Sequence, residues 1–549
     1  MPNKKPSARP SRTRSVPTLG EEIKLVSTVA ILLTAASLAF CARHGYLLLY
    51  GDAVAHLHIA RRIFDSRNPG FSQLGSVWLP LPHLLLLPFV QRTGWWQNGL
   101  AGAIPSMASY VMACAGIYRL ARQWMRPLLA LLVFAALALN PGLLYMSVTA
   151  MTEPLFLALM IWSVVHLTAF ESALREADAP EARAALIKLT LVLIAAVFTR
   201  YDGWILGTLA WLAVAYWTVR HAWWKDRANA GVLVVCTLCL LAAPLTWLGY
   251  NWRMYGDPLD FLRGPYSAAA IAKRTTKPGS LPYPGWHHVW WAFLYYVKSA
   301  KMGAAPLRCG SLLMLMAAAG TAYALVRYRS LAVPAAILLW MPIPFYTYSV
   351  AYGSVPIFLP VWFPHSYYNT RYGMELLPAF ALFPAFAVLA AIKKRPQWTR
   401  PILGFALALI VASNAFLMYA TPLVLQEAKV NAKTRMAFER SLADKLMILP
   451  PQATLLMYTS AHIGALQQIG FTLSRTINEG DYDQWQQALK DPAAAADFIV
   501  AIDGDPVAEA VKEHPQNLEM MFVICSTGQP CARLYRSTSV VRLSITPNQ

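Results

Sequence analysis

Long apolar runs alternate with short polar segments along most of the chain, and this pattern predicts a bundle of membrane-spanning helices. An α-helix needs about 20 apolar residues to cross a bilayer. We therefore expect a polytopic α-helical membrane protein with about eleven transmembrane helices between residues 23 and 421. The eleven runs cover residues 26–46, 99–121, 127–147, 153–172, 186–200, 203–220, 230–250, 309–327, 331–350, 374–392 and 401–421.

The pattern changes in residues 422–549, where Gln, Glu, Lys and Asp separate short runs of β-forming residues. Strands alternating with helices are typical of α/β domains. The sequence therefore predicts a small soluble α/β domain at the C-terminal end. Its expected strands are 454–458, 498–502 and 521–525, and its expected helical stretches are 481–490 and 506–513.

Lysine and arginine gather in alternate short loops, which the positive-inside rule assigns to the cytoplasm. The segment 1–22 is expected to be a disordered basic tail on the same side, before a first span that is retained. We expect a plasma membrane protein, in the inner membrane of a bacterium, with a cytoplasmic N-terminus and an extracytoplasmic C-terminal domain. The basic loops contain Arg119, Arg122, Arg126, Arg175, Arg183, Lys188, Arg220, Lys225, Arg227, Arg327, Arg329, Lys393, Lys394, Arg395 and Arg400.

The long outer loops, 47–98, 251–308 and 351–373, contain segments that fit the membrane interface. Residues 52–66 have the spacing of an amphipathic helix. Residues 281–301 combine Trp and Tyr with His and Lys, which predicts an aromatic interfacial helix. A re-entrant or interfacial hairpin is expected at Trp78-Leu-Pro-Leu-Pro-His-Leu-Leu-Leu-Leu-Pro88, because its three prolines break it too often for a membrane span.

Composition supports lipid as the solvent of most of the chain. Of 549 residues, 57% are hydrophobic and 13% are charged, whereas soluble chains carry about 25% charged residues. The net charge of +20 does not indicate a nucleic-acid partner, because the basic residues are divided among short loops instead of lining one soluble face. A disulfide between Cys525 and Cys531 is left open, and it depends on an extracytoplasmic location.

Ionisable residues cluster at the ends of spans on the outer side. Such groups cost several kcal/mol at membrane depth unless they are paired or hydrated, so they are candidates for function. Asp52 follows the first span, and Thr152-Glu153 opens the fourth. Thr199-Arg200-Tyr201-Asp202 joins the fifth and sixth spans, and Asn369-Thr370-Arg371-Tyr372 with Glu375 opens the tenth. We expect these residues to converge on one pocket that the outer loops cover.

Transfer from an anionic lipid is the chemistry that suits such a pocket. Asp52 and His56 are four residues apart and so share a helical face. A carboxylate held there can take a proton from a hydroxyl acceptor. The guanidinium groups of Arg200 and Arg371 match phosphate oxygens and would stabilise a departing lipid phosphate.

Three roles are open for Glu153 and Asp202: they can orient the arginines, bind a divalent metal ion, or hold the amine or hydroxyl of a substrate. A purely structural interpretation also stands. Arg200 with Asp202, and Arg371 with Glu375, would then be ion pairs that let helix ends sit among lipid headgroups.

Several short motifs resemble the GT-C superfamily of membrane glycosyltransferases, within which protein O-mannosyltransferases and lipid A aminoarabinose transferases are the most similar types. The similarity covers residues 20–420, and a soluble tail is common in the group. The motifs are Gly51-Asp52, Thr199-Arg200-Tyr201-Asp202-Gly203-Trp204, Tyr255-Gly256-Asp257-Pro258-Leu259 and Asn369-Thr370-Arg371-Tyr372 before Leu376-Leu377-Pro378.

This resemblance implies transfer of a sugar, a hexose or pentose, from a polyprenyl phosphate carrier such as undecaprenyl phosphate. The acceptor would be a lipid, a glycan or a protein hydroxyl outside the cytoplasm. Asp52 matches the first-loop acid of the group, and Arg371 matches a late arginine that faces the donor phosphate. Many mannosyltransferase-like members carry a second acid where this chain has Ala53, which argues against protein mannosylation and leaves Glu153 or Asp202 to supply that carboxylate.

We therefore expect a glycosyltransferase with Asp52 as the catalytic base. Direct displacement, the simplest reaction course, would invert the anomeric centre of the sugar. Expected donor-phosphate ligands are Arg200, Arg371, Tyr372 and Asn369; expected acceptor or substrate ligands are His56, Glu153, Asp202 and Tyr201. The alternative is a lipid or sugar transporter or flippase, which should show internal symmetry and broken helices at the bilayer midplane. A noncatalytic scaffold would not need acids and arginines at four separate span ends.

Overall fold

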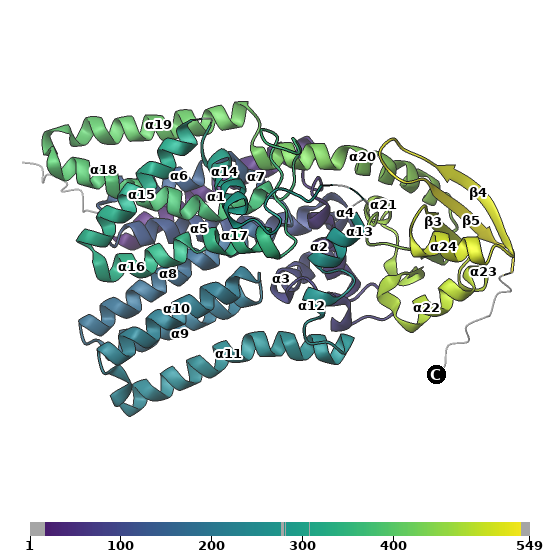
Figure 1. Ribbon diagram of the computed structural model, residues 1–549, viewed down its shortest axis with the longest axis horizontal. Coiled ribbons are helices and arrows are strands. Elements are labelled where there is room, and N and C mark those ends of the chain that lie inside the picture. Colours follow the sequence, from purple (N-terminus) through teal and green to yellow (C-terminus); the bar gives the residue numbers. More distant parts are fainter. Residues whose placement is uncertain (1–16, 276–278, 280, 307, 540–549) are drawn as a thin grey trace, which may run out of the picture.

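The structure is a computed structural model that describes residues 17–275, 279, 281–306 and 308–539. Long helices run side by side as an elongated bundle, and the C-terminal sheet lies at one end of it (Figure 1). Shorter helices from the outer loops lie between the bundle and the sheet (Figure 1). The molecule therefore has the two parts that the change in sequence pattern predicts.

Each of the eleven apolar runs forms a helix or a pair of helices. Two runs are divided: Asn140 separates α6 from α7, and Met341 separates α16 from α17, with a proline opening each second helix. The helices are α1 (Leu19–Arg43), α5 (Leu100–Ala121), α6 (Pro127–Ala138), α7 (Pro141–Met146), α8 (Glu153–Arg175), α9 (Ala179–Val197), α10 (Asp202–Arg220), α11 (Arg227–Tyr255), α15 (Cys309–Arg327), α16 (Arg329–Trp340), α17 (Pro342–Tyr352), α18 (Leu377–Lys394) and α19 (Thr399–Tyr419).

Eight helical segments of the described residues are long and apolar enough to cross a membrane, fewer than the eleven runs expected. The runs that fall short are those of α6, α9 and α10. α6 has only 12 residues, and α9 carries Glu181, Arg183 and Lys188 within one helix. These helices complete the bundle without forming long apolar segments of their own.

The first helix begins at Leu19, inside the segment 1–22 that was expected to be a basic tail. Thr18 caps it: its hydroxyl accepts from the Glu21 backbone N–H (3.3 Å), and the Glu21 carboxylate accepts from the Thr18 N–H (2.7 Å). Residues 1–16 of the expected tail lie outside the described residues.

Helices also form in the long outer loops. They are α2 (Gly51–Arg62), α3 (Pro80–Val90), α4 (Thr93–Asn98), α12 (Asp260–Arg263), α13 (Ala268–Thr275) and α14 (Val289–Ala304). The re-entrant hairpin expected at 78–88 is wrong, because this segment forms the helix α3. Its proline at the start falls in the first turn, where a missing N–H costs no helical hydrogen bond.

The C-terminal part is a mixed five-stranded sheet with helices, as the alternating pattern predicts. Strand order is β2-β1-β3-β5-β4; β1 pairs in parallel with β2 and β3, whereas β5 is antiparallel to β3 and β4. The elements are α20 (Leu423–Leu446), β1 (Leu455–Met457), α21 (Gly464–Ile469), β2 (Thr476–Ile477), α22 (Asp483–Lys490), α23 (Pro492–Ala495), β3 (Phe498–Ile502), α24 (Pro506–Glu513), β4 (Leu518–Ile524) and β5 (Ala532–Ser537).

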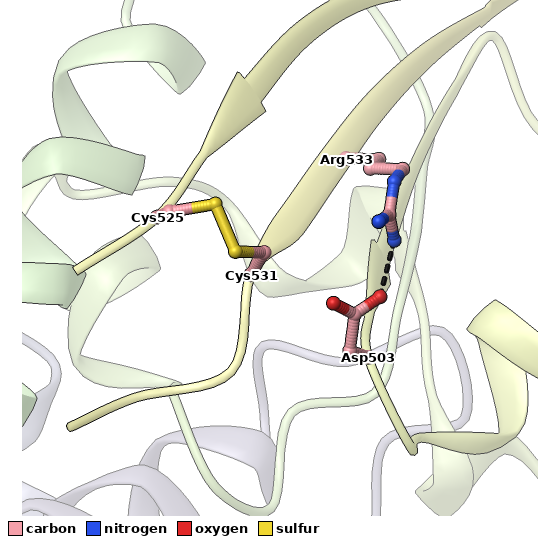
Figure 2. The surroundings of a disulfide bond; sticks show 4 residues. All are labelled: Asp503, Cys525, Cys531 and Arg533. Carbon is pink, nitrogen blue, oxygen red and sulfur yellow. Dashed lines mark hydrogen bonds and ion pairs between the residues drawn. A yellow bond between two sulfur atoms is a disulfide. The ribbon is translucent and has the colours of Figure 1, made fainter. Parts of the chain in front are cut away.

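A disulfide closes the β4–β5 hairpin, which answers the question that the sequence left open. Cys525 directly follows β4 and Cys531 directly precedes β5 (Figure 2). Beside it, Arg533 on β5 forms an exposed ion pair with Asp503 (Figure 2).

The sheet domain rests on the first outer loop. Gln467 of α21 donates to the Trp96 carbonyl (2.6 Å), and the Ser474 N–H donates to Asp65 Oδ1 (3.1 Å). Gln73 donates to the Gly480 carbonyl (3.2 Å). The domain therefore fixes the loop that begins with Asp52 and α2.

Candidate active site

Two arginines lie at the centre of a buried polar cluster. Arg371 belongs to the 3₁₀ helix η3 (Thr370–Leu376), and Arg200 lies in the turn between α9 and α10. We call the following residues the arginine–carboxylate cluster: Asp52, Glu153, Arg200, Asp202, Arg371, Glu375 and Glu427.

The local sequence explains how η3 reaches this position. Asn369 precedes it with a φ of 54°, a left-handed conformation that Asn adopts more readily than most residues. Gly373 lies against the backbone of α14, where a Cβ would come within 2.5 Å of the Ala300 nitrogen. The motif Asn369-Thr370-Arg371-Tyr372-Gly373 thus supplies both the turn and the close approach.

Carboxylates surround the Arg371 guanidinium on all sides. Its Nη2 donates to Asp52 Oδ2 (2.5 Å), its Nε donates to Glu153 Oε1 (3.0 Å), and its Nη1 lies 3.6 Å from Glu427 Oε1. The side chains of Glu153 and Glu427 are 1% and 2% exposed, whereas that of Asp52 is 41% exposed. Of these three partners, only Asp52 is open to solvent.

The Arg200 guanidinium has buried partners. Its Nε donates to Asp202 Oδ2 (3.2 Å), its Nη1 donates to Thr152 Oγ1 (2.9 Å), and its Nη2 donates to the Tyr346 hydroxyl (2.6 Å). The same Nη2 lies 3.3 Å from Glu375 Oε1. The structural interpretation paired Arg200 with Asp202 and Arg371 with Glu375; the first pair is present, whereas Glu375 faces Arg200.

Glu153 connects the two arginines. The Oε1 atom that accepts from Arg371 also lies 3.5 Å from Arg200 Nη1. Its Oε2 has no hydrogen-bond partner among the described residues. Of the three roles open for Glu153 and Asp202, these contacts favour orientation of the arginines.

An aromatic stack lies against both guanidinium groups. The Tyr372 ring centroid is 4.9 Å from the Arg371 Cζ and 5.4 Å from the Arg200 Cζ. This ring stacks on Tyr346 at 4.9 Å, and Tyr346 stacks on Tyr296 at 5.0 Å. Cation–π contacts of this kind restrain a guanidinium while leaving its N–H groups available in the plane.

Glu427 is a member of the cluster that sequence reasoning missed. It lies on α20, which leads into the sheet domain, and it accepts from the N–H groups of Asn369 (2.9 Å) and Thr370 (2.8 Å). The Thr370 hydroxyl also donates to it (2.5 Å). The sequence feature that could have identified Glu427 is its position as the only acid in Leu423-Val-Leu-Gln-Glu-Ala428, a mostly apolar segment just after the last span.

Tyr346 was missed as well, because it lies inside an apolar run where a tyrosine is ordinary. Its buried hydroxyl lies within hydrogen-bond distance of both Asp202 Oδ2 (3.1 Å) and Glu375 Oε1 (2.6 Å). Asn369, expected as a phosphate ligand, donates its side-chain amide to the Pro356 carbonyl (2.9 Å). Its contacts therefore hold the turn before Arg371.

His56 and Tyr201 lie outside this network of contacts. The His56 ring is buried against Trp78, and its Nδ1 lies 2.9 Å from His83 Nε2. Burial lowers the pKa of His56 to about 3, so the ring is neutral at physiological pH. The Tyr201 hydroxyl donates to the Val77 carbonyl (2.9 Å). Both side chains hold the first outer loop, although each is close in sequence to a cluster member.

The carboxyl groups of the cluster pair with arginines. Five carboxyl groups face two guanidinium groups, and each directs one oxygen at those cations. Among residues 17–275, 279, 281–306 and 308–539, no group of three or more His, Cys, Asp and Glu side chains is arranged to hold a metal.

Comparisons with known proteins identify the fold. No protein-family model matches the chain, and no curated protein sequence is significantly similar to it. The crystal structure of ArnT from Cupriavidus metallidurans bound to undecaprenyl phosphate aligns over 93% of this chain and 97% of that chain, with 14% identity and a TM-score of 0.58. The apo state of the same protein covers the same shares with 14% identity and a TM-score of 0.55.

The apo oligosaccharyltransferase of Archaeoglobus fulgidus covers 87% of this chain and 69% of that chain, with 11% identity and a TM-score of 0.42. The chain has the fold of ArnT, and with its long apolar helices it is a multi-pass membrane protein.

Proposed function

We propose that this multi-pass GT-C protein is a glycosyltransferase that moves a sugar from a polyprenyl phosphate carrier to an acceptor on the outer face of the membrane. One observation carries the proposal: the half-exposed Asp52 carboxylate touches the buried Arg371 guanidinium, although 319 residues separate them in the chain. An acid that is open to an acceptor thus lies beside a cation that suits a phosphate. The undecaprenyl phosphate bound by ArnT supports the choice of carrier.

The two arginines can stabilise the charge of the leaving group. A lipid phosphate gains negative charge as its bond to the sugar breaks, and fixed guanidinium groups in a buried site stabilise that charge strongly. Arg371 and Arg200 are 9% and 15% exposed, and Glu153 and Tyr372 contact both. This rigidity supports a role in stabilising the departing phosphate, with Arg371 as the ligand beside Asp52.

Asp52 suits the acceptor. In the proposed reaction, a carboxylate oxygen of Asp52 takes the proton of the acceptor hydroxyl as that oxygen attacks the anomeric carbon. The bond from this carbon to the phosphate oxygen breaks, and the phosphate leaves with the electron pair. A single displacement inverts the anomeric centre.

The orientation of the chain belongs to the proposal. The disulfide in the sheet domain supports an extracytoplasmic location, because such bonds persist in oxidising compartments. The basic loops support the opposite side as cytoplasmic. With a cytoplasmic N-terminus in a bacterial inner membrane, the cluster would face the outer leaflet.

Purified protein in lipid nanodiscs, supplied with polyprenyl-phosphate sugars and candidate acceptors, tests the proposal. Mass spectrometry should detect free polyprenyl phosphate together with a glycosylated acceptor. Asp52→Asn should abolish this transfer. Asp503→Asn is the matched control, because it removes the carboxylate of another half-exposed Asp–Arg pair far from the cluster. Normal transfer by a folded Asp52→Asn protein would contradict the assignment, and lipid movement between leaflets without a new product would favour a flippase.

A further inference from the structure

A carboxylate faces each nitrogen of the Arg371 guanidinium. Nη2 and Nε donate to Asp52 and Glu153, and Nη1 lies 3.6 Å from Glu427. A guanidinium binds a phosphate best through two parallel N–H groups on two nitrogens. A donor phosphate that binds Arg371 in this way must therefore compete with at least one of these three carboxylates.

Glu153 and Glu427 are poorly placed to leave. Glu427 also accepts the backbone N–H groups that hold the turn before Arg371, and Glu153 also faces Arg200. Both are almost fully buried. Moving either away from Arg371 would also break these other buried contacts, which is strongly unfavourable.

Asp52 can leave at much lower cost. Arg371 is its only hydrogen-bond partner within the described part of the chain, and the Asp52 side chain is 41% exposed. Water can solvate the released carboxylate, so breaking this contact does not leave an unpaired Asp52 charge buried in the protein. Asp52 also lies in the first turn of α2, away from the buried contacts that fix Glu427.

We propose that the donor phosphate and the Asp52 carboxylate compete for the same edge of Arg371, so that donor binding releases Asp52. This inference rests on the proposed function and adds that donor binding regulates the availability of the base. Without the donor, the base is held by Arg371 and cannot take a proton efficiently from an acceptor. With the donor bound, Asp52 is free beside the sugar, so the donor binds productively before the acceptor.

Competition predicts that a variant without the base binds the carrier more tightly. Undecaprenyl phosphate without a sugar is the probe, and its affinity for the full-length protein in nanodiscs is measured by native mass spectrometry. Asp52→Asn and Asp52→Ala should each bind about tenfold more tightly than the wild type, because a competing charged hydrogen bond is gone. Asp503→Asn should bind as the wild type does. Elution as a single species on size exclusion checks the fold of each variant.

The outcomes separate the two proposals. Unchanged or weaker binding by Asp52→Asn and Asp52→Ala would overturn the competition, and loss of transfer in the same variants would still support the glycosyltransferase. Wild-type protein that does not bind the probe, or Arg371→Gln that binds it as tightly as the wild type, would overturn both. Tighter binding together with lost transfer is the result we expect.

Discussion

The two arginines of the cluster have similar burial and different partners. Their side chains are 9% and 15% exposed, for Arg371 and Arg200 respectively. Arg200 faces carboxylates that are at most 1% exposed, whereas one partner of Arg371 is 41% exposed. Because a buried ion pair is costly to break and an exposed one is not, exchange of ligands can occur only at Arg371.

This difference favours the Arg371 end of the cluster for the proposed exchange of ligands. At Arg200, the contacts with Thr152, Asp202 and Tyr346 bring together helices α8, α10 and α17. At Arg371, the contact with Asp52 joins the cluster to the outer loop and to solvent. We therefore assign packing of the bundle mainly to Arg200 and substrate exchange mainly to Arg371.

The largest effect on transfer is expected for Arg371→Gln. The variant removes the cation beside Asp52, and loss of one fixed donor to a developing charge typically costs about 10²–10³ in rate. Initial rates with a polyprenyl-phosphate sugar measure the loss. Arg371→Lys should recover only part of the rate, because a lysine cannot form the paired N–H contacts. Wild-type rates in a folded Arg371→Gln protein would contradict the comparison.

Arg200→Gln should have its largest effect on stability. The change leaves Asp202 and Glu375 buried without their cation, and removing one partner of a buried ion pair costs about 3–5 kcal/mol. Thermal unfolding in detergent should therefore begin at a lower temperature for Arg200→Gln than for Arg371→Gln. In Arg371→Gln the freed Asp52 can be hydrated, Glu153 still faces Arg200, and Glu427 still accepts two backbone N–H groups. The reverse order of melting temperatures would remove the distinction between the two arginines.

The sequence predicts the bundle well, because apolar length is a local property. It also names six residues that the structure brings together: Asp52, Glu153, Arg200, Asp202, Arg371 and Glu375. Polar groups at the same ends of bundled helices avoid lipid by facing the interior of the bundle, so their convergence follows from the topology. Their functional roles stay predictions.

Other parts of the site depend on packing between distant segments, which the spacing of residues in the sequence does not predict. His56 shares a helical face with Asp52 by the four-residue rule, but Trp78 and His83 from the next segment decide where its ring lies. Glu427 belongs to a helix that the sequence assigns to the soluble domain. Its role appears only when the fold brings α20 against η3.

A smaller effect is expected for Glu427→Gln, which tests how Arg371 is positioned. A glutamine keeps one carbonyl acceptor for the backbone N–H groups of Asn369 and Thr370 but loses the charge that faces Arg371. We expect a rise of about tenfold in the KM for the donor, with kcat changed less, since one charged contact is lost.

Glu439→Gln is the control on the same helix. Glu439 is also buried, and its ion-pair partner is Arg435 (2.7 Å), which donates to the Leu48 and Leu49 carbonyls instead of contacting a carboxylate of the cluster. The control should leave the donor KM unchanged. Equal effects of the two variants would mean that α20 acts only as general support for the fold.

The smallest effect on transfer is expected for the double variant Cys525→Ser, Cys531→Ser. Its disulfide joins the ends of β4 and β5 in the sheet domain (Figure 2), and neither cysteine belongs to the cluster. Opening so short a loop should destabilise the sheet domain by about 2 kcal/mol, chiefly by freeing the unfolded chain. Transfer at low temperature should equal that of the wild type, while limited proteolysis of the domain becomes faster. In intact cells that carry the wild type, a maleimide that cannot cross the membrane should label Cys525 and Cys531 only after reduction from outside. No labelling of these two cysteines after that reduction would contradict an extracytoplasmic sheet domain, and with it the assignment of the cluster to the outer face.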